Sequence, residues 1–242
     1  MDRRRFLHSL GFFAAASNLP AAGKDSVDAS GEVKQSFQSL RQIKLIGVGG
    51  AGCRIVGQLC AERYESVSEF LAVDSELPLV SMNPSPRTIF LEKCYLDRDK
   101  QLRWDSAESR DLVSDALGRS DIVVVVAGLG GQTGTSVAPM VANLARRAGA
   151  RVGAVVMSPF PFEGVQRVLR GDSGVLMTKI NAHITFAMSN EAICDSYSRE
   201  VTLREAYAAA SNTIRASIRS TVALLSDPIW WETHSGRRIV AS

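Results

Sequence analysis

The chain has 242 residues, of which 45% are hydrophobic, 22% charged and 7% aromatic, and its mean hydropathy is +0.03. These values are typical of one large or two small globular domains, and they exclude a disordered or fibrous protein. The net charge is only +3 and includes the run Arg3, Arg4 and Arg5. The remainder is therefore close to neutral, and we expect no nucleic-acid face built from bulk charge.

The first 23 residues have a basic start, a mildly apolar stretch and an Ala-rich end. This pattern is similar to a secretory leader of the twin-arginine type. The apolar stretch is too short and interrupted to cross a bilayer. Two interpretations stay open: an export signal, or a tail that makes weak membrane contact. Residues 24–40 are polar and aperiodic, which predicts a linker. We therefore expect residues 1–40 to be leader and linker.

After residue 41, apolar runs alternate with amphipathic stretches. Strands are expected at residues 43–48, 70–73, 88–91, 122–127, 151–157 and 183–188. Helices are expected at residues 51–64, 105–118, 134–148, 163–180 and 201–225. This alternation predicts an α/β fold, a three-layer Rossmann-like parallel sheet with helices on both faces that ends in a long helix. In such sheets, ligands bind beyond the carboxyl ends of the strands.

The first glycine loop, Gly47-Val48-Gly49-Gly50-Ala51-Gly52, lies between a predicted strand and a predicted helix and satisfies G-x-G-x-x-G. Asp74 ends the next strand at the place where a dinucleotide-binding fold keeps its ribose-binding acid. Taken alone, the loop favours an oxidoreductase that binds NAD(P) or FAD. The simpler alternative is that the glycines serve only a tight turn.

A second loop at residues 127–136 follows the most apolar strand and contains four glycines, two threonines and a serine. A dinucleotide fold needs one pyrophosphate turn, so two loops favour several phosphates held between two helix starts. The sequence has no G-x-x-x-x-G-K-[ST], which excludes a P-loop.

Four segments, in the same order along the chain, resemble the motifs of the tubulin/FtsZ family of GTPases. Residues 130–136 resemble its signature G-G-G-T-G-[ST]-G, with Gln132 and Ser136 replacing two glycines. The other three are residues 46–52, which resemble the first loop of FtsZ, residues 158–167, which resemble P-F-x-F-E-G-x-x-R, and residues 189–195, which resemble N-E-A-[IL]-x-D. The resemblance covers residues 42 to 225.

The resemblance implies a site for GTP or GDP with Mg²⁺. The residues implied to hold the phosphates are Gly49, Gly50, Ala51, Gly52, Gly130, Gly131, Thr133, Gly134 and Thr135. Glu163 and Arg167 would lie near the ribose, Asn190 would bind the guanine edge, and Tyr207 would stack on the base. Each has a simpler alternative: a surface i,i+4 ion pair for Glu163 and Arg167, a helix N-cap for Asn190, and core packing for Tyr207.

Two departures from the family pattern matter for chemistry. Where the family has Asp or Asn to read the base, this chain has Ser211 followed by Asn212, which weakens the expected preference for guanine. The family's acidic loop N-x-D-x-x-D, which activates water in a neighbouring subunit, is not recognisable after residue 225, where Asp227 and Glu232 are the only carboxylates. Residues 227–242 are expected to form a short tail in place of the family's second domain.

The favoured hypothesis is a GTP-binding protein of residues 41–226 whose hydrolysis is weak or depends on a partner, because phosphate chemistry needs placed charge and an oriented water. Its role would be filament assembly or its regulation in the cytoplasm, with a tubulin/FtsZ-like protein or a second copy as partner. The alternatives are the oxidoreductase and a scaffold that binds no nucleotide.

We interpret the four cysteines (Cys53, Cys60, Cys94 and Cys194) as isolated thiols of a reducing compartment, because they lack zinc-site spacing. Trp230 and Trp231 either pack or form a contact site.

Overall fold

The computed structural model describes residues 42–62, 64, 66–75, 86–91, 94–95, 102–103, 106–190, 203–234 and 239–241. For residues 94–95, 102–103, 203–211 and 239–241 it describes the backbone only. The leader and linker predicted at residues 1–40 lie outside this part of the chain, so the interpretation of those residues stays a prediction.

Seven strands form one sheet in the order β3-β2-β1-β6-β7-β8-β9, and every neighbouring pair is parallel. The strands are β1 (Ile43–Val48), β2 (Glu69–Asp74), β3 (Arg87–Phe90), β6 (Ile122–Gly128), β7 (Arg151–Ser158), β8 (Ile184–Ser189) and β9 (Ile239–Ala241). The predicted parallel α/β fold is confirmed.

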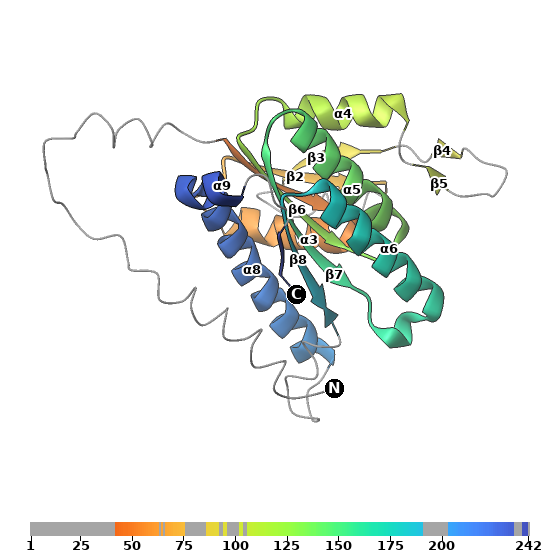
Figure 1. Cartoon of the computed structure of the whole chain (residues 1–242). Coiled ribbons are helices and arrows are strands. Elements are labelled where there is room, and N and C mark those ends of the chain that lie inside the picture. The colour runs from red at the N-terminus through yellow and green to blue at the C-terminus, as the bar shows by residue number, and fades with distance from the viewer. Residues whose placement is uncertain are drawn as a thin grey trace, which may run out of the picture. The chain divides into compact units, whose positions relative to one another are not determined.

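Helices cover both faces of this sheet (Figure 1). One face carries α4 (Ala107–Leu117), α5 (Gln132–Arg147) and α6 (Val165–Asn181), and the other carries α3 (Gly49–Ala61) and the long α8 (Leu203–Ser226). The apolar run of β6 serves both layers, because Val123 and Val125 pack toward α4 and α5 while Val124 and Val126 pack toward α3 and α8. A strand covered on both faces is expected to be apolar throughout. No helix in the described part of the chain is long and apolar enough to cross a membrane.

Some elements differ from the sequence expectation. Helix α3 begins at Gly49 and ends at Ala61, whereas the helix was expected at residues 51–64. Glycine has low helix propensity, but tertiary packing overrides it here. A two-stranded antiparallel sheet, β4 (Cys94–Tyr95) with β5 (Leu102–Arg103), was not expected. The expected tail contains α9 (Pro228–His234) and the edge strand β9, whose three residues are too few for a readable period.

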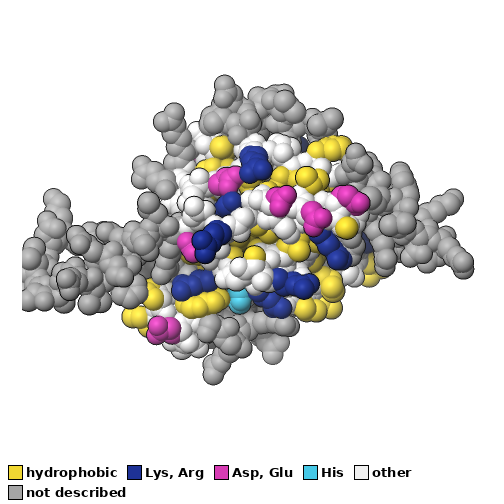
Figure 2. Space-filling view, turned by 90° about the horizontal axis from the view of Figure 1, so that it is seen from above, with side chains coloured by type: hydrophobic (Ala, Val, Ile, Leu, Met, Phe, Trp, Pro, Cys, Tyr) yellow, Lys and Arg dark blue, Asp and Glu magenta, His cyan; other side chains and the backbone are white. Residues whose placement is uncertain are grey.

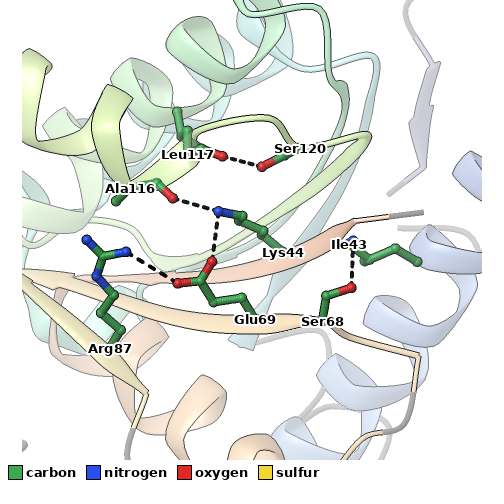
Figure 3. A network of polar contacts seen from close by, with 8 residues as sticks. All are labelled: Ile43, Lys44, Ser68, Glu69, Arg87, Ala116, Leu117 and Ser120. Atoms are coloured by element: carbon green, nitrogen blue, oxygen red, sulfur yellow. Dashed lines mark hydrogen bonds and ion pairs between the residues drawn. The ribbon is translucent and has the colours of Figure 1, made fainter. Parts of the chain in front are cut away.

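A buried lysine joins the amino end of the sheet to α4 (Figure 3). Lys44, only 7% exposed, donates a hydrogen bond to the carbonyl of Ala116 at 2.8 Å. Its Nζ also lies 2.7 Å from Glu69 Oε2, and the other oxygen of Glu69 lies 3.6 Å from Arg87. Because the charge is paired and hydrogen-bonded, its burial is tolerated.

The two adjacent tryptophans pack onto the folded unit. Both are partly buried against the core beneath α3 and α8. Arg151 lies over the ring of Trp231 at 4.7 Å, and His183 contacts the same ring edge-on. Trp230 stacks on His234. Of the two interpretations left open for this pair, the structure therefore shows packing.

Candidate nucleotide-binding site

Three of the loops that the sequence predicts to bind a nucleotide lie at the same edge of the sheet. Strands β1, β6 and β7 are adjacent and parallel, so their carboxyl ends lie side by side. The first glycine loop follows β1, the second follows β6, and the segment with Glu163 and Arg167 follows β7. The topology thus brings together residues that are more than a hundred positions apart.

The two glycine loops touch. Gly49 has a φ of 70°, and a Cβ there would lie 3.0 Å from the backbone nitrogen of Gly134. A Cβ on Gly134 would lie 2.1 Å from the carbonyl oxygen of Gly128, and one on Gly52 would lie 2.2 Å from the carbonyl oxygen of Val126. These contacts are with backbone, which cannot move aside. These glycines therefore allow the first turns of α3 and α5 to approach each other.

Two other glycines of the same loops face open space. A Cβ built on Gly50 or on Gly131 would meet no atom within 4 Å. Gly50 is exposed and Gly131 is partly exposed. The loops therefore leave room beside the helix starts for a ligand that approaches the backbone closely.

The helices that begin here have no side-chain caps. Val48, Gly131 and Gly164 are the N-cap residues of α3, α5 and α6, and no cap side chain accepts a hydrogen bond in any of the three. None of these helices has an acidic residue in its first turn. Free N–H groups and the positive end of the helix dipole both favour an anion such as phosphate.

The hydroxyl groups of the second loop tie it to its neighbours. Thr135 Oγ1 accepts a hydrogen bond of 2.8 Å from the backbone nitrogen of Gly130, and Thr133 Oγ1 lies 3.1 Å from Ser75 Oγ. Ser75 follows β2 directly, so this contact links a fourth strand end to the site. Sequence reasoning missed Ser75, although its position just after the strand-ending Asp74 was a signal.

The segment after β7 packs on the second glycine loop. Glu163 accepts a hydrogen bond of 2.8 Å from the backbone nitrogen of Phe160, and its other oxygen lies 3.0 Å from Arg167 Nε. A Cβ on Gly130, whose φ is 90°, would lie 2.9 Å from Arg167 Cγ and from Pro159 Cγ. The Arg167 side chain of this ion pair therefore lies directly beside the second glycine loop, at the start of α6.

Cys53, which the sequence analysis interpreted only as an isolated thiol, contacts the first glycine loop. The thiol of Cys53 donates to the carbonyl of Gly47 at 3.3 Å and lies 3.5 Å from the carbonyl of Val73. Burial, and secondarily the charge of Asp74, raises the pKa of Cys53 to about 12. The thiol is therefore neutral and links the first loop to the end of β2. Among the described cysteines, Cys53 and Cys60 are free.

The structure describes only some of the side chains that the sequence predicts to contact the base. Asn190 directly follows β8 at the same sheet edge and is partly buried. Tyr207 and Ser211 lie in α8, but their side chains are outside the described part of the structure. Asn212 is exposed. The roles assigned to Asn190 and Tyr207 stay predictions.

Asp74, the residue that favoured a dinucleotide-binding site in the sequence, is buried. Asp74 is only 6% exposed, and its Oδ1 accepts a hydrogen bond of 2.7 Å from the backbone nitrogen of Ser75. A ribose-binding carboxylate must reach the ligand's hydroxyls. The geometry of Asp74 therefore gives little support to the oxidoreductase.

Comparison with known proteins distinguishes the tubulin/FtsZ family from the oxidoreductases that bind NAD(P) or FAD. Residues 42–198 match the model of the Tubulin/FtsZ family, GTPase domain, which is more than half of the chain. The chain belongs to the tubulin/FtsZ family. It is 32% identical over 192 residues to the cell division protein FtsZ of Buchnera aphidicola subsp. Schizaphis graminum, an alignment that covers 77% of this chain and 50% of that protein. The chain thus spans about half the length of this relative.

Solved structures show the same fold. An empty FtsZ dimer from M. jannaschii superposes with a TM-score of 0.67 at 23% identity, covering 83% of this chain and 60% of that one. CetZ2 from Haloferax volcanii, solved as a GTPγS-bound protofilament, gives 0.57 at 24% identity, covering 76% and 58%. At these identities, the two structures show that the chain shares their fold.

Proposed function

We propose that this member of the tubulin/FtsZ family binds GTP and GDP at the carboxyl edge of its sheet. The observation that carries the proposal is the pair of touching glycine loops that open α3 and α5, with open space at Gly50 and Gly131. Uncapped N–H groups at both helix starts match the several negative charges of a triphosphate. The phosphates would be held by the first turn of each helix, with Thr133 at the second.

Magnesium would be held mainly by the nucleotide. Mg²⁺ at such sites binds phosphate oxygens and waters with one or two protein oxygens. Among the residues that the structure describes, no group of three His, Cys, Asp or Glu side chains could hold a metal ion. We therefore propose that Mg²⁺ enters with GTP, and that chelation weakens GTP binding without unfolding the protein.

Hydrolysis by the isolated chain is proposed to be weak. Asp227 lies at the start of α9, where its Oδ1 accepts hydrogen bonds from the backbone nitrogens of Ile229 at 2.9 Å and Trp230 at 3.3 Å. This carboxylate caps a helix, so it is not held ready to orient a water. Glu232 is exposed on the same helix. We propose that a second protein with an acidic loop completes the site, which gives this chain a role in assembling or regulating a filament.

The structural relatives support the proposal that this protein acts in the assembly of a filament. One structural relative is a dimer and another a nucleotide-bound protofilament. By analogy, the partner would be a tubulin/FtsZ-like protein or a second copy of this chain. We propose a cytoplasmic location, because GTP is available in the cytoplasm.

The proposal for the amino terminus is that residues 1–23 make weak contact with a membrane. The comparisons lend no support to the twin-arginine interpretation. Sequencing the mature amino terminus from cell fractions tests this, and a cleaved form outside the cytoplasm would contradict it.

The test is a calorimetric titration of the purified chain with GTP, GDP and NAD in separate experiments. We expect micromolar binding of GTP and GDP that is weakened by EDTA, and no binding of NAD. Binding of NAD without GTP would restore the oxidoreductase, and binding of neither would favour the scaffold. Hydrolysis is then measured with and without an intact FtsZ added in trans, and we expect phosphate release to rise only in its presence.

A further inference from the structure

Helix α6 is packed with its small residues inward. Its buried residues are Gly171, Gly174 and Thr178. A Cβ on Gly171 would lie 2.7 Å from Pro159 Cδ, and one on Gly174 would lie 2.8 Å from Thr135 Cγ2. The helix therefore lies close against the second glycine loop and α5. A surface helix normally turns its large apolar side chains toward the core. In α6, Val175 packs against the core, but most of the large apolar side chains do not.

Large apolar side chains lie on the outer side of the same helix. Val165, Leu169, Leu176 and Ile180 are 72%, 55%, 59% and 38% exposed. At about 100° per residue, these four positions fall on one line along the helix, opposite the two buried glycines. We call this line the α6 stripe. These side chains form two exposed apolar pairs along about four turns, Val165 with Leu169 and Leu176 with Ile180, with Asp172 and Ser173 between the pairs. Large apolar side chains gathered on one exposed face are typical of a contact site.

The spacing of the four residues in the α6 stripe is palindromic: the intervals are the same from either end of the helix. Its intervals are four, seven and four residues, with the centre between Asp172 and Ser173. When two such helices lie antiparallel about a two-fold axis at that centre, Val165 of each copy meets Ile180 of the other and Leu169 meets Leu176. A two-fold interface requires a surface that is complementary to itself, and the stripe satisfies this condition.

The central carboxylate favours a second copy over a lipid surface. Asp172 is exposed and lies beside the middle of the stripe. An interfacial helix keeps carboxylates away from its apolar face, because anionic headgroups repel them and the acyl region excludes them. In a pair of helices, Asp172 lies at the rim of the contact, where water still reaches it. The two Asp172 side chains then lie near each other across the axis, which weakens the pair through like-charge repulsion.

The area of the stripe sets the strength of the contact. Its four side chains expose roughly 400 Å² per copy, so two facing stripes bury about 800 Å² in total, below the ~1,200 Å² of stable specific interfaces. Met177, which is 48% exposed and flanks the stripe, adds to this area. The expected complex is thus a weak, reversible dimer that becomes strong only when copies are already held in a row.

We propose that α6 pairs antiparallel with α6 of a second copy of this chain through the α6 stripe. This lateral contact uses the outer face of α6 and needs no bound nucleotide. It is therefore separate from any assembly through the nucleotide site, and its failure would leave the proposed GTP binding untouched.

The first experiment is sedimentation equilibrium of the full chain without nucleotide, up to high protein concentration. We expect a monomer–dimer equilibrium that Leu169→Asp weakens about tenfold or more. Asp172→Asn should strengthen it by removing the repulsion at the axis. Leu112→Asp is the matched control, because Leu112 is an equally exposed leucine (50%) on α4, away from the stripe. Circular dichroism checks that each variant is folded.

The second experiment tests the register. Leu169→Cys and Leu176→Cys variants are mixed and oxidised, with the parent chain oxidised in parallel to account for the natural cysteines. A disulfide between the two different variants should dominate over those within either one. A monomer at all concentrations, equal loss of dimer with Leu112→Asp, or preferential Leu169-to-Leu169 linkage would overturn the proposal. So would binding of the monomer to phosphatidylglycerol vesicles that Leu169→Asp abolishes.

Discussion

Several helix ends at the two edges of the sheet find different partners, although α4 begins with a side-chain cap from Ser106. At the amino edge, carbonyls in the last turns of α4, α6 and α8 accept hydrogen bonds from basic side chains of the chain itself. The pairs are Lys44 with Ala116 at 2.8 Å, Arg146 with Ile180 at 3.2 Å, and Arg151 with Leu225 at 2.8 Å. At the carboxyl edge, α3, α5 and α6 begin with no side-chain cap.

This difference indicates which edge is built for a ligand. Helix ends carry unpaired backbone groups and a partial charge, and both must be satisfied by side chains, water or a ligand. The protein supplies its own cations at the amino edge. It supplies no anion at the first turns of α3 and α5, where two glycines face open space. Under the proposed function, a nucleoside triphosphate provides this negative charge.

The amino edge also holds α9, which occupies the stretch after residue 225 where the family's acidic loop was not recognisable in the sequence. Charged side chains of both signs are interspersed on the face shown in Figure 2, so the described part of that face has no single sign of charge.

The largest expected effect comes from filling the open space at the carboxyl edge. Gly131→Leu should weaken GTP binding about 100-fold, because the new side chain occupies the space beside the start of α5. Gly131 has a φ of −75°, which any residue adopts, so the fold should persist. Gly149→Asn is the control, since Gly149 also faces open space but lies in the turn between α5 and β7 at the amino edge. Unchanged GTP affinity in Gly131→Leu would place the ligand elsewhere.

A second substitution separates glycines that pack from glycines that face the ligand. Gly134→Ala places a Cβ 2.1 Å from the Gly128 carbonyl oxygen. Overpacking against backbone costs about 3 kcal/mol or more, and alanine recovers only about 1 kcal/mol in helix propensity. We expect the free energy of unfolding to fall by about 2 kcal/mol or more in urea denaturation. Gly131→Ala should leave it nearly unchanged, and equal stability of the two variants would contradict the packing.

At the amino edge, the expected effect is on stability alone. Arg151→Met keeps the aliphatic stem but removes the hydrogen bond to Leu225 and the cation–π contact with Trp231, at a cost of about 1–2 kcal/mol. Arg147→Met is the matched control, because Arg147 is exposed at the end of α5. GTP affinity should be the same in both variants. A loss of GTP affinity in Arg151→Met would mean that the edges are not independent.

The smallest effect concerns pH. Burial, and then the charge of Arg146, lowers the pKa of His183 below its usual 6.5. Its Nδ1 accepts a hydrogen bond from the backbone nitrogen of Val152, which also favours the neutral ring. The unfolded chain therefore takes up a proton first, and stability falls as the pH drops below 6.5. His183→Asn keeps an acceptor for Val152 but does not titrate, so its stability should depend less on pH in this range. Identical pH profiles would contradict the assignment.

The sequence was most informative about the long elements and the loops between them. The run Ile122–Ala127 and the glycines after it predicted a buried strand that opens onto a helix, and both are present. Short elements were missed because α9 and β9 depend on contacts with distant residues, such as Trp231 with Arg151. A pattern along one chain cannot express such contacts.

Within the site, the sequence predicted which loops meet but not what each residue does there. Gly131 and Gly134 are neighbours in one motif, yet only the structure shows that one faces space and the other faces the backbone of Gly128. The roles of Ser75 and Cys53 depend on β2 lying beside β1, which no local signal encodes. The sequence likewise did not show that α6 buries Gly171 and Gly174 while most of its large apolar side chains are exposed.

The most direct test of the central claim is a titration of ¹⁵N-labelled protein with GTP and Mg²⁺, followed by amide NMR shifts. We expect the largest shifts at the backbone N–H groups of residues 50–52 and 131–135, with the amides of Arg151 and His183 unmoved. Shifts confined to the end of β2 around Asp74, or centred on the amino edge, would contradict the account.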